Sequence, residues 1–262
     1  MRTAAFFARL GKRILNNVTA LLVLLMLLYG GYSLWDTWQI LQGGFTADSL
    51  LALKPAVTAE ASEDSPTFED LLALNPDVRA WITIDDTHID HPVLQGEDDM
   101  EYVNKNVYGE FELSGAIFVS SQNAPDFTDS YILTYGHHMS NGGMYGDVEK
   151  FLDASFFEEH TTGTLILPDR VYGIELFASM EVNAFDGQIF DPDKRGEWVM
   201  KNFLEYVEKN AVHYRPIGVT AQDQVISLTT CSDISTNGRF ILLGRLVAET
   251  EKETETQAEN SK

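Results

Sequence analysis

The sequence has 262 residues, enough for one domain of about 200 residues with appended segments or for two small domains. Because 44% of the residues are apolar and 11% are aromatic, the chain can build a hydrophobic core, and a wholly disordered protein is excluded. With 18 basic and 40 acidic residues the formal charge is -22, so nucleic-acid phosphates would repel the chain and nucleic acid is excluded as a partner.

The sole cysteine, Cys231, has no companion in the sequence. It cannot form an internal disulfide, and a zinc site built on several cysteines is excluded. Cys231 is therefore either inert packing or a reactive thiol.

The N-terminal segment is predicted to anchor the chain in a membrane. Residues 1–13 form a basic segment without acids, and residues 14–35 carry no charge. As a helix, residues 14–35 would be about 33 Å long, enough to span a bilayer. The basic flank favours a cytoplasmic N-terminus, with the rest of the chain on the extracellular face. The alternative is a cleaved signal peptide, but its apolar region is usually shorter, about 7 to 15 residues, and GGYSLWDTW offers no good cleavage site.

Four further segments follow the anchor. Residues 36–66 have few apolar runs and end in KPAVTAEASEDSP, which is typical of a stalk. The folded domain is expected over residues 67–248, beginning with a short helix that Thr67 caps. Apolar residues at helical spacing predict a longer helix over residues 197–210. Residues 249–262 are acidic and lack large apolar side chains, so we expect a disordered tail.

Within the folded domain, eight β-rich runs are separated by turn residues. At this spacing they predict an all-β domain, either a barrel or a sandwich, with the longer helix inserted late. The runs cover residues 80–84, 91–94, 115–120, 131–136, 163–168, 172–182, 224–230 and 239–247.

Two segments concentrate residue types that can carry chemistry. In YILTYGHHMSNGG a strand leads into a glycine-rich loop with His137 and His138 at its start. In the second segment a strand ends at Cys231, and Arg239 begins the next strand. If those two strands form a hairpin, Cys231 and Arg239 become cross-strand neighbours about 5 Å apart at Cβ. We therefore expect the two segments to form one site.

A cysteine, a histidine and an arginine together favour acyl transfer. A thiol with an ordinary pKa near 8.5 is mostly protonated at neutral pH, and a nearby imidazolium or guanidinium favours the nucleophilic thiolate. Histidine can give a proton to a leaving amine, and arginine can stabilise the oxyanion formed when a carbonyl is attacked. The predicted reaction therefore proceeds through a thioester.

These residues, in this order, resemble the sortases. The motifs are Tyr135-Gly136-His137, Leu228-Thr229-Thr230-Cys231 and Asn237-Gly238-Arg239-Phe240. Class B in particular is similar in the segment NPDVRAWITIDDTHIDHPVLQGEDDMEYV, in the double-histidine loop and in the helix before the cysteine strand. The resemblance runs from about Phe68 to Val247.

The resemblance implies a closed eight-stranded sortase-type β-barrel with a short N-terminal helix and one long helix inserted late, preceded by a single transmembrane helix. It implies a membrane-anchored cysteine transpeptidase on the outside of a Gram-positive-type cell. Such an enzyme cleaves the C-terminal sorting signal of a surface protein after its threonine and transfers the acyl fragment to an amine of the cell-wall precursor. It implies no cofactor.

The resemblance also implies a role for each site residue. Cys231 is the nucleophile, and His137 is the general acid for the leaving amine and then the base for the incoming one. Arg239 positions the substrate and stabilises the oxyanion. Asp233 matches an acid found in some class B members and is auxiliary, as is His138 in the loop or groove.

Several alternatives remain open. His138 could replace His137 as the acid–base residue, and Arg245 could replace Arg239. His88 and His91 lie near three aspartates, but their spacing matches no standard ligand pair, so we expect no metal there. The acidic run at residues 97–99 is interpreted as solvated surface charge, although a calcium site is not excluded.

Three other functions compete with wall anchoring. A pilin polymerase would use the same chemistry with a protein lysine as acceptor, and a membrane-tethered cysteine hydrolase would use water. An anchored β-domain that only binds partners would keep Cys231 buried and inert.

Overall fold

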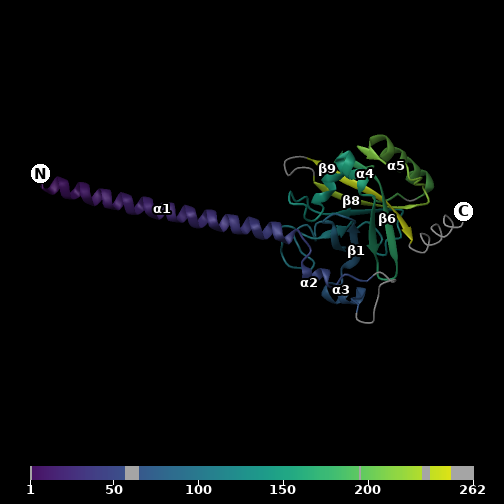
Figure 1. The fold of residues 1–262 in the computed structure, drawn as a ribbon, viewed down its shortest axis with the longest axis horizontal. Coiled ribbons are helices and arrows are strands. Elements are labelled where there is room, and N and C mark those ends of the chain that lie inside the picture. The colour runs from purple at the N-terminus through teal and green to yellow at the C-terminus, as the bar shows by residue number, and fades with distance from the viewer. Residues whose placement is uncertain (1, 57–64, 195, 232–236, 249–262) are drawn as a thin grey trace. The chain divides into compact units, whose positions relative to one another are not determined.

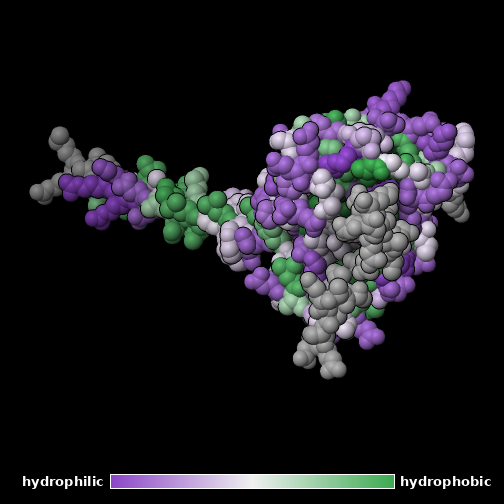
Figure 2. All heavy atoms as spheres, turned by 45° about the vertical axis from the view of Figure 1, so that its right-hand side comes forward, coloured by the Kyte–Doolittle hydropathy of each residue, from purple (hydrophilic) through white to green (hydrophobic). Residues whose placement is uncertain are grey.

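The computed structural model describes residues 2–56, 65–194, 196–231 and 237–248, so the tail predicted over 249–262 lies outside the described residues. The chain divides into two compact units, Met1–Gln42 and Gly43–Lys262. The first unit is formed by helix α1 (Arg2–Gly43) up to residue 42. Figure 2 shows hydrophobic side chains along α1 beyond a more hydrophilic N-terminal part. Among the described residues this is the one helix region long and apolar enough to cross a membrane, so α1 is a candidate span.

The second unit is built on a closed β-barrel (Figure 1). Eight of its described strands are ordered β5-β1-β2-β3-β4-β8-β9-β6, and β6 pairs with β5 to close the ring. This confirms the predicted closed eight-stranded barrel. The strands of the ring are β1 (Val78–Ile84), β2 (Asp90–Leu94), β3 (Ile117–Val119), β4 (Tyr131–Tyr135), β5 (Thr162–Ile166), β6 (Val171–Asn183), β8 (Gln224–Cys231) and β9 (Gly238–Ala248).

One short strand lies outside the prediction. The two-residue strand β7 (His213–Tyr214) pairs with β6 on the side of β6 opposite to β9, and it widens the sheet locally. Its sequence is too short to show an alternating pattern, which is why the run was not recognised.

The late helix covers one face of the barrel. Helix α5 (Glu197–Asn210) matches the predicted range, and its buried side chains Met200, Phe203 and Val207 join a core cluster with residues of β4, β6, β8 and β9. The ring of Phe203 lies 4.6 Å from the ring of Tyr131 in β4, measured between centroids. Because α5 covers its outer face, β4 is buried on both faces and reads as a continuous apolar run.

The other helices pack around the barrel and the connections between its strands. Helix α3 (Phe68–Leu74) begins as predicted, since the backbone N–H and hydroxyl of Thr67 both donate to Asp70 Oδ2, at 2.8 and 2.9 Å. Figure 1 shows α3 and α2 (Asp48–Leu51) on one side of the barrel, and α5 and α4 (Ala154–Glu159) on another. A 3-10 helix, η1 (Gly146–Leu152), precedes α4.

Residues 43–56 differ from the stalk expected over 36–66. They belong to the same compact unit as the barrel, and Leu50 is buried in a core cluster with Leu71 and Trp81. The apolar residues of this stretch do not follow one period over a sufficient length, so the sequence pattern alone did not reveal that they pack.

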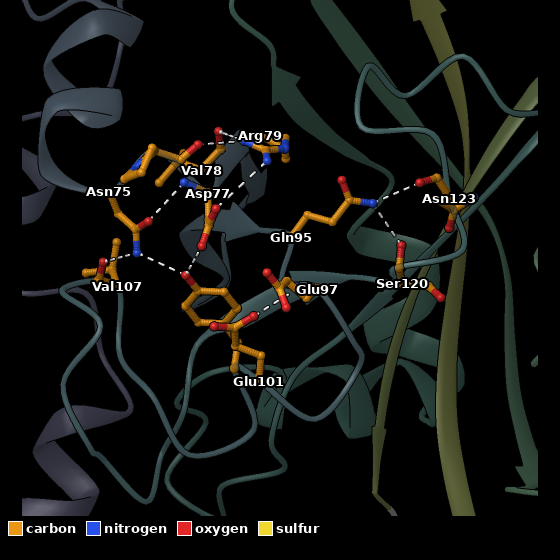
Figure 3. Close-up of polar contacts among 12 residues, drawn as sticks. Asn75, Asp77, Val78, Arg79, Gln95, Glu97, Glu101, Val107, Ser120 and Asn123 are labelled. Carbon is orange, nitrogen blue, oxygen red and sulfur yellow. Dashed lines mark hydrogen bonds and ion pairs between the residues drawn. The ribbon is translucent and has the colours of Figure 1, made fainter.

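A polar network holds the long connection between β2 and β3 (Figure 3). The Gln95 amide donates to the carbonyls of Ser120 and Asn123, at 3.1 and 2.8 Å. Farther along, Asn75 Nδ2 donates to Val107 O at 2.8 Å, and the Tyr102 hydroxyl donates to Asp77 at 2.7 Å. These buried bonds fix a segment without regular structure, and that segment forms one wall of the site.

Candidate active site

The two chemistry-bearing segments meet at one edge of the barrel. Strand β4 runs parallel to β8, with Tyr135 opposite Thr229, and the N–H of Gly136 donates to Thr229 O at 3.1 Å. Strand β8 is antiparallel to β9, and its last residue, Cys231, is opposite Arg239. The cross-strand pairing that the sequence predicts for these two residues is therefore present. His137 lies two residues beyond the end of β4, the strand that pairs with β8.

A cavity of about 410 Å³ opens at this edge. Its walls come from six parts of the chain: the β2–β3 connection, β3, the end of β4 with the following loop, the β6–α5 connection, the end of β8 and the start of β9. His137 and Arg239 both line it, together with Thr229 and Thr230, which directly precede Cys231. The connection between β6 and α5 contributes Ala184 and Phe190.

His137 is held by a main-chain carbonyl. Its Nε2 lies 2.7 Å from Val103 O. Because a carbonyl oxygen only accepts hydrogen bonds, Nε2 carries the proton in the neutral ring, and Nδ1 is the nitrogen that can gain or lose one. The backbone of His137 is tied as well, since its carbonyl accepts from Tyr145 N at 3.1 Å.

His138, the alternative to His137, is directed to a different partner. Its Nε2 lies 2.9 Å from the Glu149 carboxylate, and its ring meets the edge of Phe240 at 6.1 Å between centroids. His138 is not among the residues lining the cavity. His138 therefore lies in the loop beside the cavity and not in its wall.

Of the two candidate arginines, one lines the cavity and the other pairs with a residue outside it. Arg239 lines the cavity, and its Nη1 donates to Gly238 O at 2.8 Å. Arg245 instead forms a salt bridge with Glu175 on β6, where its Nε lies 3.0 Å from the carboxylate. Asp233, the auxiliary candidate, lies outside the described residues.

Buried polar groups line the floor of the cavity. The hydroxyls of Thr229 and Thr230 are buried and, among the described residues, have no hydrogen-bond partner. Burial raises the pKa of Tyr135 well above its usual range, the carboxylate of Asp99 raises it further, and Arg239 opposes both effects. Tyr135 is therefore a neutral hydroxyl at working pH.

Sequence reasoning missed the wall formed by the β2–β3 connection. Asp99, interpreted as solvated surface charge, lines the cavity, and its carboxylate accepts from Ser121 N at 2.6 Å and from the Ser120 hydroxyl. Val103 supplies the carbonyl that holds His137. No local pattern marks these residues, because they reach the site through a loop without periodicity.

His88 and His91 do not converge on a common point. His88 Nδ1 lies 2.9 Å from Asp147, whereas His91 Nδ1 lies 2.6 Å from the Thr46 hydroxyl. Each histidine therefore has its own protein partner.

No family model matches the sequence. Sortase B of Listeria monocytogenes is 29% identical over 242 residues, which cover 90% of this chain and 98% of that protein. A class B sortase of Streptococcus pyogenes, described as involved in pilus biogenesis, is 38% identical, with a TM-score of 0.63 over 69% of this chain and 97% of that one. Sortase B of Clostridium perfringens is 30% identical, with a TM-score of 0.65 over 69% of this chain and 100% of that one.

At this barrel edge Cys231 and Arg239 are cross-strand neighbours, and His137 and Arg239 line one cavity, an arrangement that fits a cysteine transpeptidase. With the sequence identity and coverage given above, the chain belongs to the class B sortases. It is an enzyme of the sortase transpeptidase type.

Proposed function

We propose that this transpeptidase is anchored by α1 with its N-terminus in the cytoplasm, and that it cleaves the C-terminal sorting signal of surface proteins after a threonine. The acyl fragment passes to an amine of the cell-wall precursor. The observation that carries this proposal is the pairing of Cys231 with Arg239 beside the cavity that His137 lines.

The proposed steps follow from the chemistry of the three residues. The Cys231 thiolate attacks the threonine carbonyl carbon, and the guanidinium of Arg239 stabilises the resulting oxyanion. The C–N bond breaks as His137 Nδ1 gives its proton to the leaving amine, and a thioester remains on Cys231. The incoming amine then attacks the thioester carbonyl, loses its proton to His137, and releases the thiolate.

The cavity suits an extended peptide. Its volume of about 410 Å³ and its lining by Val103, Phe118 and Phe190 leave room for an apolar side chain of a bound peptide. Auxiliary roles for His138 and Asp233 complete the proposal: His138 supports its loop through Glu149, and Asp233, two residues past Cys231 in the sequence, assists the cysteine.

Pilin polymerisation is the second candidate function, with the same steps and a protein lysine as acceptor. One observation favours it: the Streptococcus pyogenes relative, at 38% identity, is described as involved in pilus biogenesis. A membrane-tethered hydrolase would use water in the last step.

The test combines the full chain in detergent micelles with a library of sorting-signal peptides. Mass spectrometry should find the acyl fragment on Cys231, and Cys231→Ala should carry no adduct. Three reactions are compared, one with an added peptide that has a free N-terminal amine, one with an added lysine side chain and one without an added amine. The product formed in each distinguishes wall anchoring, pilin polymerisation and hydrolysis, in that order. If Cys231→Ala cleaves the peptides at the normal rate, the proposed mechanism is wrong.

A further inference from the structure

The segment that directly follows α1 in the sequence packs on the loop that carries His137. We call residues 44–54 the strap. The carbonyl of Gly44 accepts a hydrogen bond from Met144 N at 2.7 Å. The two backbones approach so closely that a Cβ on Gly143 would lie 2.8 Å from Gly44 O, and a Cβ on Gly44 would lie 2.2 Å from Met139 Sδ. Gly143 meets backbone atoms of the strap, so a side chain does not fit there, whereas a side chain at position 44 would have to displace the end of the Met139 side chain.

The contacted loop leads directly to His137. Tyr145 N donates to His137 O, and His138 forms an isolated bridge with Met144. Met144 has φ of 50°, a left-handed backbone conformation that a residue with a side chain adopts only when its surroundings hold it there. The strap binds the N–H of this same residue. Met144, which the strap binds, and Tyr145, which binds the His137 carbonyl, are therefore neighbours in the chain.

The strap is fixed to the barrel at two places, at Thr46 near its start and at Lys54, its last residue. The Thr46 hydroxyl donates to Asp90 O at 2.5 Å and contacts His91 Nδ1 at 2.6 Å. Lys54 Nζ donates to the Asp90 carboxylate at 2.8 Å. Between these anchors, Leu50 is buried in the core cluster that contains Trp81.

A second contact joins the strap to the β1–β2 hairpin, which in turn bonds the segment after the histidine loop. The ring of Phe45 meets the ring of His88 at 5.3 Å between centroids, in an edge-on arrangement. The backbone N–H and Nδ1 of His88 both lie 2.9 Å from Asp147 Oδ2, at the start of η1. The strap thus contacts the histidine loop through Gly44 and the β1–β2 hairpin through Phe45, and His88 links that hairpin to the start of η1.

The barrel closes without the strap. The pairings that form the ring of eight described strands join only residues between 78 and 248. The contacts of the strap are therefore additional to the strand pairings that close the barrel, and its first residue meets the histidine loop rather than a strand.

We propose that the strap is a positioning element of the active site. It holds the loop at residues 139–145, and through it His137, in the geometry that proton transfer requires. This inference rests on the proposed acid–base role of His137. It also means that the functional catalytic unit begins at residue 43 or 44 and not at residue 67.

The first test uses the full chain in detergent micelles. Gly44→Val places a branched side chain against Met139 and separates Gly44 O from Met144 N. The kcat/KM for peptide cleavage should fall about 10- to 100-fold, the effect expected of a small displacement of a catalytic group. The matched control is Gly31→Val in α1, where a Cβ meets nothing within 4 Å, and which should keep normal activity. Normal activity of Gly44→Val would overturn the proposal.

A second variant removes an anchor without adding volume. Thr46→Val deletes the hydroxyl that bonds Asp90 and His91, and it should lower kcat/KM in the same direction. Its control is Thr128→Val, whose hydroxyl bonds only the exposed Asp126 at 2.8 Å among the described contacts. If Gly44→Val does not fold, Thr46→Val decides the question by the same criteria.

Combination with His137→Ala distinguishes positioning from general damage. If the strap acts through His137, a strap variant should lower the residual activity of His137→Ala by less than about 2-fold, because coupled residues are not additive. An equal loss in both backgrounds would overturn the inference and leave the proposed function intact. If His137→Ala alone has normal turnover, the proposed function itself is wrong.

Discussion

Stability below neutral pH should depend on His91. This side chain in β2 is 4% exposed, its Nε2 has no hydrogen-bond partner, and burial lowers its pKa to about 4 against the small opposing effect of Asp90. In the unfolded chain an ordinary histidine has a pKa near 6.5. Above that pH both states are neutral and the folded state keeps its full stability.

As the pH falls through 6.5, the unfolded chain binds a proton that the folded chain does not, so the free energy of unfolding decreases. The decrease continues until the pH reaches about 4, where folded His91 is protonated as well. Because each pH unit in this window is worth about 1.4 kcal/mol, the total loss is about 3 kcal/mol. Asp90 and Asp147 do not interfere, since contacts with Lys54 and Lys150 outweigh burial and keep the pKa of each carboxyl below its usual value.

Urea unfolding measures this effect. The chain from residue 39 onward, followed by circular dichroism between pH 7.5 and 4.5, should lose stability over this range. His91→Met cannot titrate, so it should be less stable at pH 7.5 but show a much smaller decrease toward pH 4.5. An unchanged pH dependence in His91→Met would show that another group is responsible and that His91 is not buried in its neutral form.

The remaining predictions concern the site and the anchor. Arg239→Lys should lower kcat/KM about 10²- to 10³-fold, because an ammonium cannot reproduce the planar fork that holds an oxyanion. The control is Arg245→Lys, since Arg245 pairs with Glu175 outside the cavity. A larger loss of kcat/KM in Arg245→Lys than in Arg239→Lys would contradict the role given to Arg239. His137→Ala should keep a thiol that iodoacetamide alkylates but turn over very slowly, since the leaving amine then lacks a proton donor, and fast turnover measured by peptide cleavage would exclude His137 as the acid. Deletion of residues 1–38 should yield soluble, active protein, whereas deletion of 1–54 should lower peptide cleavage; equal activities of the two would argue against a role for the strap.

Part of the site could be predicted from the sequence because its parts are local. Cys231 ends one strand and Arg239 begins the next, so a hairpin brings them opposite each other whatever the rest of the fold does. His137 stands just beyond a strand, at the start of a loop, where functional residues are common. Asp99 and Val103 could not be predicted, because neither their spacing nor their neighbours distinguish a cavity wall from an exposed loop.

The sequence by itself determined the elements of this protein: a long apolar helix near the N-terminus, eight β-runs, one late helix, and the order of the three reactive residues. These features follow from local periodicity, turn residues and charge, which act between residues close in the chain. Only the tertiary structure decided the order of the strands in the ring, the parallel pairing of β4 with β8, the cavity between segments distant in the chain and the docking of residues 44–54 on the histidine loop. Such contacts form because burial of apolar surface and pairing of backbone polar groups are satisfied for the whole chain at once, and no short stretch of sequence records which distant partner will satisfy them.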